Sequence, residues 1–498
     1  MKNRSVILLF LFFPLCLFGQ SVRFNNTYHW NNSEASTNIF QSGSGYVVIG
    51  PAQDSASGNS GVGFLFIDSI GNQIGKKTFG RISEQFNVPY SIKTTDSCYI
   101  VTGQHIDLSS FSPDAYLIKF NQYGDTLWTK IYRDTMYQVS YACQQSNDKG
   151  FILIGYGDTL LSSSTITQFL LIKTDSLGDI LWKKLIGISN PNFGFGVNTV
   201  NDGGYVFTGG RGNPTEPIIF KTDSLGNVLW TRVVPCIRNG SVGSIKQTLD
   251  GGFLTTGFIS DTGNNSWNFN MSLLVKLFSD GTVDWSKKDY TKNLTSIADC
   301  FYDFVQLQDS SYIVVGSMMN DTAVHYLDMD GVIYHISKSG NELWNRRYDK
   351  TSGFNKGESF NDLVKTNDGG YAVCGSFAQP QYDFWVVKVD SLGCDSAGCE
   401  FVGIDEKSIY EKQELEILIY PNPVSDEFKI QINSDKATGK IIEFSLIDIT
   451  GRKVFQKSNL FNSQAEKINV SEFNNGIYFY SISGRCNFLK RGKLIIAH

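Results

Sequence analysis

The chain has 498 residues, with 43 basic and 48 acidic side chains and a formal net charge of −5. Because these charges are spread along the chain, the sequence offers no cationic surface for a phosphate backbone, and nucleic acid is not expected as a partner. The 48 glycines, 36 phenylalanines and 23 tyrosines favour strands and tight turns over helices. The composition therefore predicts an all-β protein.

The N-terminus has the pattern of a secretory signal peptide. Lys2 and Arg4 precede an apolar run, residues 6–18, which is followed by Gly19. The run is shorter than the ~20 residues that a membrane-spanning helix requires, and a small residue marks the expected cleavage point. We predict a signal peptide over residues 1–19 and no membrane span in the mature protein.

An internal repeat fills most of the chain. Each copy reads Asp-Gly-Gly-Tyr, an apolar run and Gly, then a gap, a second apolar run, Asp-Ser-Leu-Gly and Leu-Trp. One aromatic residue opens the first apolar run of each of seven copies, about 54 residues apart, at Tyr46, Tyr99, Phe151, Tyr205, Phe253, Tyr312 and Tyr371. A unit of this length with four strand-like runs is typical of a propeller blade. The repeat predicts a seven-bladed β-propeller over residues 20–400.

The repeated residues have structural roles in this interpretation. Glycine in the Asp-Ser-Leu-Gly turn supplies the positive φ that a tight hairpin needs. Asp175, Asp223 and Asp390 are expected to bond to the backbone of their own turns. The tryptophan after each turn is large enough to fill the space between neighbouring sheets. The seventh copy lacks a fourth strand, and we expect residues 22–30 to supply it and so close the ring.

The repeat resembles the propeller repeats of secreted proteins from the Bacteroidetes, where Asp-Gly-Gly-Tyr and Asp-Ser-x-Gly hairpins recur. The resemblance covers roughly residues 22–393. The repeat also looks like a distant relative of the quinoprotein propellers, but the chain lacks the adjacent cysteine pair that a quinone-dependent dehydrogenase would require. These resemblances imply an architecture and leave the function open, because one fold serves many functions.

Two cysteines, Cys394 and Cys399, enclose a short loop at the end of the repeats. In an exported protein a disulfide between them is expected more than metal binding. The remaining cysteines after the signal peptide stand singly, several within strand-like runs, and we expect buried thiols there.

A charged linker, residues 401–415, leads to a tail with a different pattern, residues 416–498. The tail holds four motifs: Tyr-Pro-Asn-Pro from residue 420, Ile-Asp-Ile-Thr-Gly from 447, Phe-Asn-Asn-Gly-Ile-Tyr-Phe from 473 and Gly-Lys-Leu-Ile-Ile from 492. Alternating apolar runs between turn residues predict a small antiparallel β-sandwich.

The tail closely resembles the type A C-terminal sorting domain of the type IX secretion system. The resemblance implies an Ig-like fold that the secretion machinery recognises, and a protein that is secreted or attached to the outer-membrane surface. The sorting signal that it implies consists of Pro421, Asn422, Pro423, Asp448, Gly451, Gly476, Tyr478, Lys493 and Leu494. The alternative is an ordinary accessory domain that stays on the mature protein.

No catalytic constellation is evident in the sequence. Five histidines are too few and too scattered to suggest a histidine-based triad or metal site, and aspartates in hairpin turns give paired-carboxylate hydrolysis little support. The run Asp328-Met-Asp330-Gly331 loosely resembles a calcium loop, but the rest of that motif is missing and a turn is expected. We therefore expect no catalytic residues, no metal and no cofactor.

Binding residues are expected on one face of the disc. The first and third connections of each copy are tight and define the tight-turn face; the other connections differ between copies and define the variable face, which is where binding loops usually lie. The larger variable loops are residues 54–61, 105–113, 157–167, 261–270 and 379–383. Their candidate ligand-binding aromatics are Phe111, Trp267, Phe269 and Tyr382. We predict an extracellular binding or adhesion protein for a glycan or protein; the alternatives are a surface hydrolase with its site in the propeller mouth, or aromatics that only pack the loops onto the disc.

Overall fold

The computed structural model describes residues 22–29, 35–53, 60–80, 84–109, 113–134, 137–161, 164–187, 191–213, 215–234, 239–260, 269–289, 297–319, 329–350, 357–378, 382–396, 416–433, 443–448, 453–458, 466–483 and 488–498. The regular elements in these residues are all β-strands. The chain divides into two compact units, residues 1–396 and 397–498. In the described ranges no helix has the length and apolar character needed to cross a membrane. The predicted signal peptide lies outside these ranges.

The described part of the first unit forms seven sheets, each with four antiparallel strands, and one of them has a short fifth strand in addition. The first three sheets contain β2 (Asn38–Ser42), β3 (Gly45–Gln53), β4 (Ser60–Ile67) and β5 (Gln73–Phe79); β6 (Glu84–Lys93), β7 (Tyr99–Asp107), β8 (Pro113–Phe120) and β9 (Thr126–Tyr132); and β10 (Gln138–Gln145), β11 (Phe151–Leu161), β12 (Ser164–Thr174) and β13 (Ile180–Ile186). The next two contain β14 (Asn192–Thr199), β15 (Tyr205–Arg211), β16 (Glu216–Thr222) and β17 (Val228–Val233); and β18 (Gly240–Gln247), β19 (Phe253–Ile259), β20 (Phe269–Leu277) and β21 (Val283–Asp289), with β22 (Ile297–Ala298) beside β20. The last two contain β23 (Cys300–Gln306), β24 (Tyr312–Met319), β25 (Met329–Ile336) and β26 (Glu342–Tyr348); and β27 (Ser359–Lys365), β28 (Tyr371–Ala378), β29 (Tyr382–Val389) and β1 (Phe24–Tyr28).

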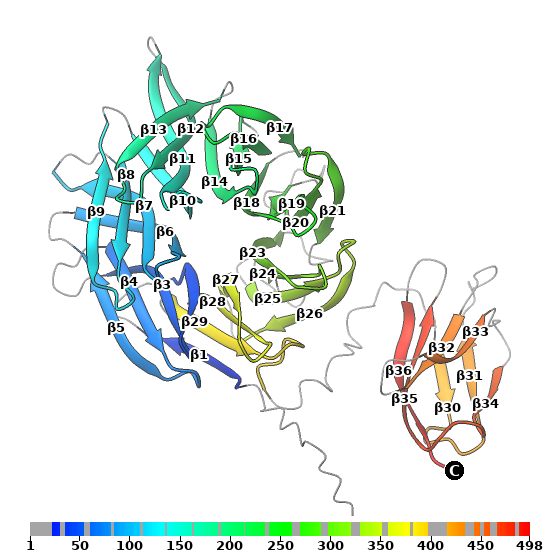
Figure 1. Ribbon diagram of the computed structural model, residues 1–498. Helices are drawn as coiled ribbons and strands as arrows, with labels where there is room; N and C mark the ends of the chain where they lie inside the picture. The colour runs from blue at the N-terminus through cyan, green and yellow to red at the C-terminus, as the bar shows by residue number, and fades with distance from the viewer. Residues whose placement is uncertain are drawn as a thin grey trace, which may run out of the picture. The chain divides into compact units, whose positions relative to one another are not determined.

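These sheets follow one another around a ring, with the first strand of each sheet innermost (Figure 1). Inner strand β2 contacts β6 on one side and β27 on the other, so the ring has no open seam. Its core is divided into apolar clusters, one in the gap between each pair of neighbouring sheets. Radial sheets with apolar contacts between them define a β-propeller.

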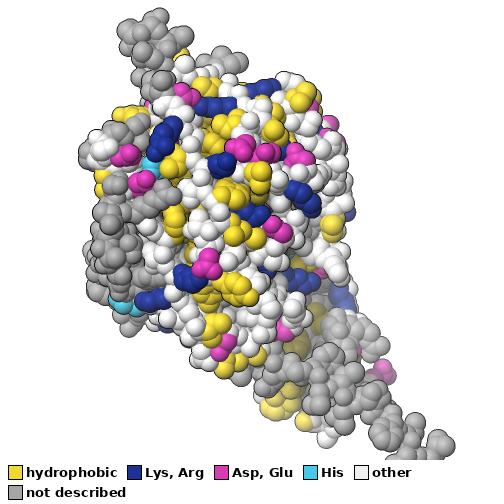
Figure 2. Space-filling model, turned by 60° about the vertical axis from the view of Figure 1, so that its left-hand side comes forward, with side chains coloured by type: hydrophobic (Ala, Val, Ile, Leu, Met, Phe, Trp, Pro, Cys, Tyr) yellow, Lys and Arg dark blue, Asp and Glu magenta, His cyan; other side chains and the backbone are white. Residues whose placement is uncertain are grey.

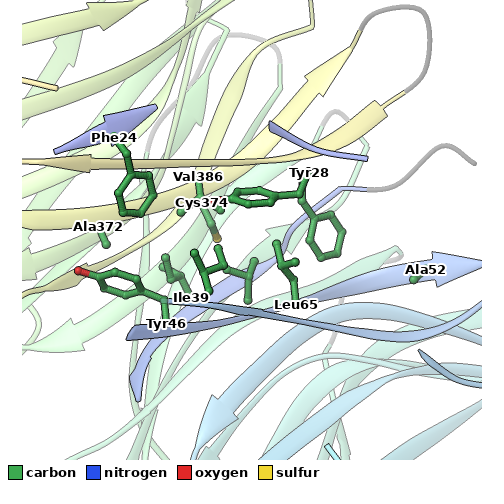
Figure 3. Close-up of a cluster of buried hydrophobic side chains, with 12 residues drawn as sticks. Phe24, Tyr28, Ile39, Tyr46, Ala52, Leu65, Ala372, Cys374 and Val386 are labelled. Atoms are coloured by element: carbon green, nitrogen blue, oxygen red, sulfur yellow. The ribbon is translucent and has the colours of Figure 1, made fainter. Parts of the chain in front are cut away.

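Strand β1 joins the two ends of the ring. It pairs antiparallel with β29 over its whole length. Phe24 and Tyr28 are 8% and 7% exposed, and they share a cluster with Tyr46 and Leu65 of the first sheet (Figure 3). The Tyr28 hydroxyl also donates a hydrogen bond of 2.7 Å to the Gly71 carbonyl. Residues from opposite ends of the repeat region therefore form one core.

The tryptophans of the repeat fill the gaps near the outer edge. Trp230 on β17 lies against the hairpin glycine of the next sheet, Gly281, where an added Cβ would be 2.8 Å from the indole ring. Gly281 has a φ of 81°, a left-handed conformation that favours glycine. The same contact pairs Trp128 with Gly178, Trp182 with Gly226, Trp285 with Gly340 and Trp344 with Gly393. The scaffold role predicted for the tryptophans is confirmed.

Two local predictions are wrong. The expected variable loop over residues 157–167 is mainly a hairpin, since β11 and β12 continue through it to a pair between Leu161 and Ser164 (Figure 1). Its threonines and isoleucine have high β-propensity and extend the ladder of the sheet. The turn expected around Asp330 and Gly331 is strand instead, because the apolar run that follows pairs with β24 and carries Gly331 opposite Ser317.

The second unit is a two-layer β structure. One sheet contains β30 (Glu416–Tyr420), β31 (Glu427–Asn433) and β34 (Glu466–Asn469). The other contains β33 (Lys453–Ser458), β32 (Glu443–Ile447), β35 (Gly476–Ser483) and β36 (Phe488–Ile496). Phe428 and Ile468 of the first sheet and Phe444 and Leu446 of the second belong to one buried cluster. The alternating apolar residues of the tail thus form one core, to which both sheets contribute side chains.

Candidate functional site

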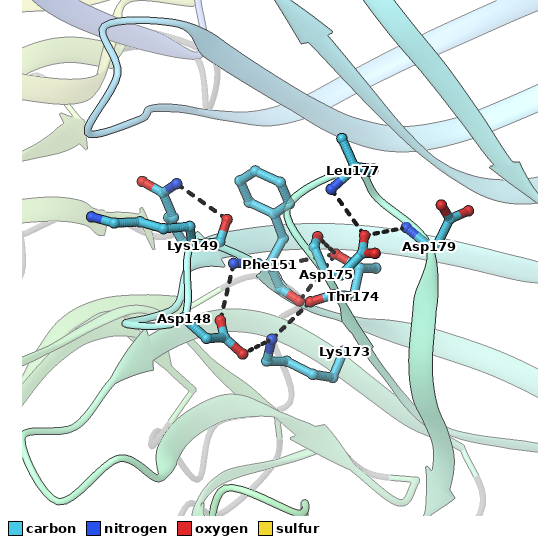
Figure 4. A network of polar contacts seen from close by, with 10 residues as sticks. Asp148, Lys149, Phe151, Lys173, Thr174, Asp175, Leu177 and Asp179 are labelled. Atoms are coloured by element: carbon cyan, nitrogen blue, oxygen red, sulfur yellow. Dashed lines mark hydrogen bonds and ion pairs between the residues drawn. The ribbon is translucent and has the colours of Figure 1, made fainter.

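On the tight-turn face, charged residues of the repeat are paired with each other. Lys173 Nζ donates to Asp148 Oδ2 at 2.7 Å although the lysine side chain is only 4% exposed (Figure 4). The same pair recurs as Lys119–Asp96, Lys221–Asp202, Lys276–Asp250 and Lys388–Asp368. Burial raises the pKa of Asp96, but hydrogen bonds from Lys119 and Thr94 outweigh it and lower the pKa to about 2. These Lys–Asp ion pairs stabilise the turns, and each charged group already has a partner.

The aspartates of the outer hairpins are also committed to structure. Asp175 Oδ1 accepts hydrogen bonds of 2.9 Å from the backbone N–H groups of Leu177 and Asp179. Asp223 and Asp390 make the equivalent two bonds in their own turns. The predicted turn role of Asp175, Asp223 and Asp390 is confirmed.

Aliphatic side chains of the same hairpins are exposed at the outer edge of the ring. Leu127, Leu181 and Leu229 are 53%, 59% and 58% exposed. Figure 2 shows apolar side chains on one side of the molecule interspersed with Lys, Arg, Asp and Glu. An ion pair between neighbouring sheets joins Lys130 Nζ on β9 to Asp179 Oδ1 at 2.7 Å. An edge of mixed character is typical of a solvated surface.

The inner strands bring together two buried carboxyl groups from neighbouring copies of the repeat. Asp303 on β23 and Asp362 on β27 are 6% and 8% exposed, and they hydrogen-bond to each other. Burial, followed by the charge of Asp303, raises the pKa of Asp362 well above its usual range. Asp303 and Asp362 are 59 positions apart, as are Tyr312 and Tyr371, so each stands nine residues before the aromatic of its copy. Only the ring places them side by side.

This carboxyl pair links inner strands of neighbouring sheets. Asp362 Oδ2 accepts hydrogen bonds from Asn38 Nδ2 at 3.2 Å and from the Ile39 backbone N–H at 2.9 Å. Asp303 Oδ2 accepts one of 2.8 Å from Lys246 Nζ, and its other oxygen accepts one from a serine hydroxyl on the same strand, β18. Because these oxygens are already hydrogen-bonded, the pair ties the sheets together and has little capacity left for a substrate.

Replacing Asp362 by asparagine should make stability less dependent on pH. Since the pKa of Asp362 is raised by folding, its favourable contribution is present below the unfolded pKa of about 3.9 and is lost as pH rises through the folded pKa. The amide can still accept from Ile39 and donate to Asp303, so Asp362→Asn should gain in melting temperature relative to the parent between about pH 5 and pH 8. Asp362→Ala, which removes the acceptors, should lose about 1–3 kcal/mol. A gain that shrinks with pH would contradict the buried, protonated carboxyl.

A glycine on the second strand of a sheet leaves room for a β-bulge on the neighbouring inner strand. A Cβ at Gly155 on β11 would lie 1.8 Å from the Val139 carbonyl oxygen, and the β10–β11 register shifts between Ser140 and Ala142. The extra residue, Tyr141, is half-buried between two buried neighbours and has no partner in the β10–β11 ladder. The register shifts at comparable places on the inner strands β6, β14, β18, β23 and β27.

Two bulges and their neighbours form an aromatic wall, defined here as Tyr141, Tyr156, Phe193 and Phe195. The Tyr141 ring centroid lies 5.5 Å from Phe195 on the next inner strand and 6.0 Å from Tyr156, and Tyr156 lies 5.3 Å from Phe193. All four are half-buried. Within the described ranges, neither Tyr141 nor Tyr156 makes a side-chain hydrogen bond. The wall therefore offers ring faces and two uncommitted hydroxyls.

A further bulge residue shows that water reaches the inner strands. Tyr302 on β23 is 39% exposed, although burial raises the pKa of its hydroxyl. Part of the Tyr302 side chain is thus accessible to solvent, although protein atoms surround its hydroxyl group. Sequence reasoning missed Tyr302 and the aromatic wall because a bulge depends on the backbone of a partner strand; the repeated glycine of the second strand was the available signal.

Most of the binding aromatics predicted from the sequence cannot be placed. Phe111 and Trp267 lie outside the described residues, and Phe269 opens β20 with its side chain outside them. Tyr382 opens β29 and is 45% exposed. Its neighbour Asp383 pairs with His29 through a 2.7 Å contact. The described residues thus provide one exposed candidate on the variable face.

Three carboxylates gather at the ends of β25, β26 and β27. Oxygen atoms of Asp330, Asp349 and Glu358 lie within 4.8 Å of one another. Arg347 Nη1 approaches Asp330 Oδ2 at 3.6 Å, and the Lys350 backbone N–H donates to Glu358 at 3.3 Å. The cluster already has these partners, so we assign no metal to it.

The cysteines agree with an exported protein. Cys394 is buried and disulfide-bonded; its expected partner, Cys399, lies outside the described residues, so the pairing stays a prediction. Cys143 and Cys374 are buried free thiols, as expected. Cys98 and Cys300 are free and half-buried.

In the second unit, motifs from the two ends of the tail meet. Asn422 Nδ2 donates to the Lys493 carbonyl at 2.7 Å, and its Oδ1 accepts from the Ile495 N–H at 2.8 Å. One side chain thus holds the backbone on both sides of Leu494, which is fully buried. Tyr478 is 8% exposed and donates to the Asn474 carbonyl at 2.9 Å. Of the other predicted signal residues, Pro421, Pro423, Asp448 and Gly476 are described, and Gly451 lies outside the described residues.

The first unit is of the β-propeller class, and solved structures resemble it at the level of fold. They include YCF48 bound to D1 peptide (8% identity, 74% of this chain and 96% of that chain, TM-score 0.41) and the β-propeller domain of the trilobed protease from Pyrococcus furiosus (8%, 73% and 97%, 0.39). Another is a puromycin hydrolase mutant complexed with PGG (11%, 81% and 60%, 0.44). Such similarity carries nothing about function. No curated protein matches the sequence.

Residues 418–497 match the family described as secretion system C-terminal sorting domain. The chain therefore carries a type IX secretion system sorting domain, which implies an origin in the Bacteroidetes. It is a secreted protein, extracellular or attached to the outer-membrane surface. The resemblance stated from the four motifs is confirmed.

Proposed function

We propose that the seven sheets are the blades of a single seven-bladed propeller over residues 20–400, and that the tail is an Ig-like sandwich reached through a linker, residues 401–415. Support comes from one strand order shared by all seven sheets, with β1 in the fourth place of the last. Two packed antiparallel layers support the sandwich. The signal peptide over residues 1–19 would direct the chain into the export route.

We propose that the exported propeller binds a glycan or a protein at or outside the cell surface. The observation that carries this proposal is the aromatic wall. Half-buried ring faces with uncommitted hydroxyls suit sugars by stacking and hydrogen bonding, and they suit protein side chains equally. The wall lies on the half of β10 and β14 that is nearer the variable face, to which Tyr382 also belongs.

A screen of the purified mature chain against glycans and cell-surface extracts tests this function. We expect a bound ligand whose binding falls at least about tenfold in the Tyr141→Ala, Phe195→Ala double variant, because two stacked rings would be lost. Leu127→Ala, at the outer edge, is the control and should bind as the parent does. Binding that survives the double variant but falls in Tyr382→Ala would move the site to the variable loops and contradict the role of the wall.

A surface hydrolase is the second candidate, and Asp303 and Asp362 favour it. A protonated carboxyl beside a second carboxyl is an arrangement that acid-base catalysis uses. Their existing hydrogen bonds to Asn38 and Lys246 speak for a structural role. Turnover of a polysaccharide panel that disappears in Asp362→Asn, with no loss of melting temperature, would establish the enzyme and displace the binding proposal.

A further inference from the structure

The last two strands of the sorting domain carry side chains that packing does not require. On β35, Tyr478 and Tyr480 point into the core and are 8% and 9% exposed, whereas Ile477 and Phe479 are each 40% exposed. Successive residues of a strand face opposite sides of the sheet, so the two exposed residues share the outer side. Burial explains the first pair and gives no reason for the second.

Strand β36 continues the same pattern. Leu494 and Ile496 are 0% and 1% exposed, while Lys493 is exposed and Ile495 is half-buried. The register pairs Ile477 with Ile495 and Phe479 with Lys493. Paired residues of neighbouring strands lie on the same side of a sheet. Ile477, Phe479, Ile495 and Lys493 therefore form one outward strip, called the outer strip below.

We propose that the outer strip is the surface by which the export machinery reads the sorting domain. Its four residues belong to the third and fourth motifs of the tail, within the residues that match the sorting family. Three apolar side chains lie side by side in this strip, and contiguous exposed apolar side chains mark protein interaction sites. The geometry points to a partner surface that is apolar, with an acidic group placed opposite the Lys493 ammonium.

The Pro-Asn-Pro motif acts as a positioning element for this strip. Asn422 is hydrogen-bonded to the backbone of Lys493 and Ile495, and the Val424 N–H donates to the Ile495 carbonyl at 2.8 Å. These bonds fix the end of β36 so that Lys493 and Ile495 stay in register with β35. The motif at residue 420 and the motif at residue 492 thus serve a single surface.

The test uses the full chain in its own host and measures how much protein reaches the medium or cell surface and how much stays in the periplasm. Ile477→Thr with Phe479→Thr keeps strand propensity, and we expect secretion to fall at least about tenfold because two apolar contacts are lost. Lys493→Glu, a change at an exposed side chain, should reduce secretion as well. Lys467→Ser, exposed on the other sheet, is the control and should be secreted normally.

Protease resistance of the retained protein separates recognition from folding. The proposal expects the threonine double variant to be retained in the periplasm with parental resistance, whereas Leu494→Ser should be retained because its core is damaged. Secretion of either outer-strip variant at the parental level would overturn the proposal. Loss of resistance in both outer-strip variants would also overturn it, because the strip would then be structural.

Discussion

Deleting residues 22–29 is expected to destabilise the whole ring by about 5 kcal/mol or more, since truncation of one buried aromatic residue already costs about 3–5 kcal/mol. The deletion removes Phe24 and Tyr28 from the cluster that also contains Tyr46 and Leu65. It also strips β29 of its outer partner and leaves an exposed edge. Thermal unfolding and protease sensitivity of the mature chain measure the effect.

Point variants of β1 should give a graded series. Phe24→Ala should cost about 3–5 kcal/mol. Tyr28→Phe should cost about 1 kcal/mol, because it loses only the hydrogen bond to Gly71. A deletion no more harmful than Tyr28→Phe would mean that the ring closes without β1, contrary to the pairing described here.

Replacing Gly281 by alanine should be far more damaging than the same change at Gly251. Both glycines have a φ near 80°, so both substitutions carry the backbone strain of a left-handed residue, about 1 kcal/mol or somewhat more. Only at Gly281 would the new methyl group lie 2.8 Å from the Trp230 ring; around Gly251 nothing lies within 4 Å. We expect an additional loss of about 1–3 kcal/mol from overpacking.

A double-mutant cycle isolates the contact. Trp230→Ala alone should cost about 3–5 kcal/mol. In that background the alanine at residue 281 should cost no more than the alanine at residue 251, because the clash has been removed. Equal costs at the two glycines in the parent protein would show that Trp230 of the preceding sheet does not press on the hairpin.

The sequence was most informative where one residue type recurs in every copy. Three such residues are the aromatic that opens the second strand, the hairpin glycine and the turn aspartate. Their roles depend on residues nearby in the sequence, so they could be predicted at Phe151, Gly178 and Asp175. The role of the lysine on the third strand does not follow from its local sequence, because its partner is an aspartate on another turn. Lys173 and Asp148 are 25 positions apart and meet only through the sheet.

The candidate site depends on relations between strands, which a single sequence hides. Tyr141 lies in a bulge that Gly155 admits, and it meets Phe195 only because the two sheets are neighbours. Asp303 and Asp362 meet because their sheets are neighbours. In the tail, the family motifs were evident, but the bonds from Asn422 to the last strand required the fold. Of the aromatics predicted to bind, Tyr382 alone has a described side chain.

The most direct test of the account is the affinity of the mature chain for the ligand found in the screen, measured beside the Tyr141→Ala, Phe195→Ala variant at equal folded fraction. We predict saturable binding by the parent, with a dissociation constant at least about tenfold weaker in the variant. Equal affinities, or turnover of the ligand by the parent that depends on Asp362, would contradict a binding protein that uses its inner aromatic wall.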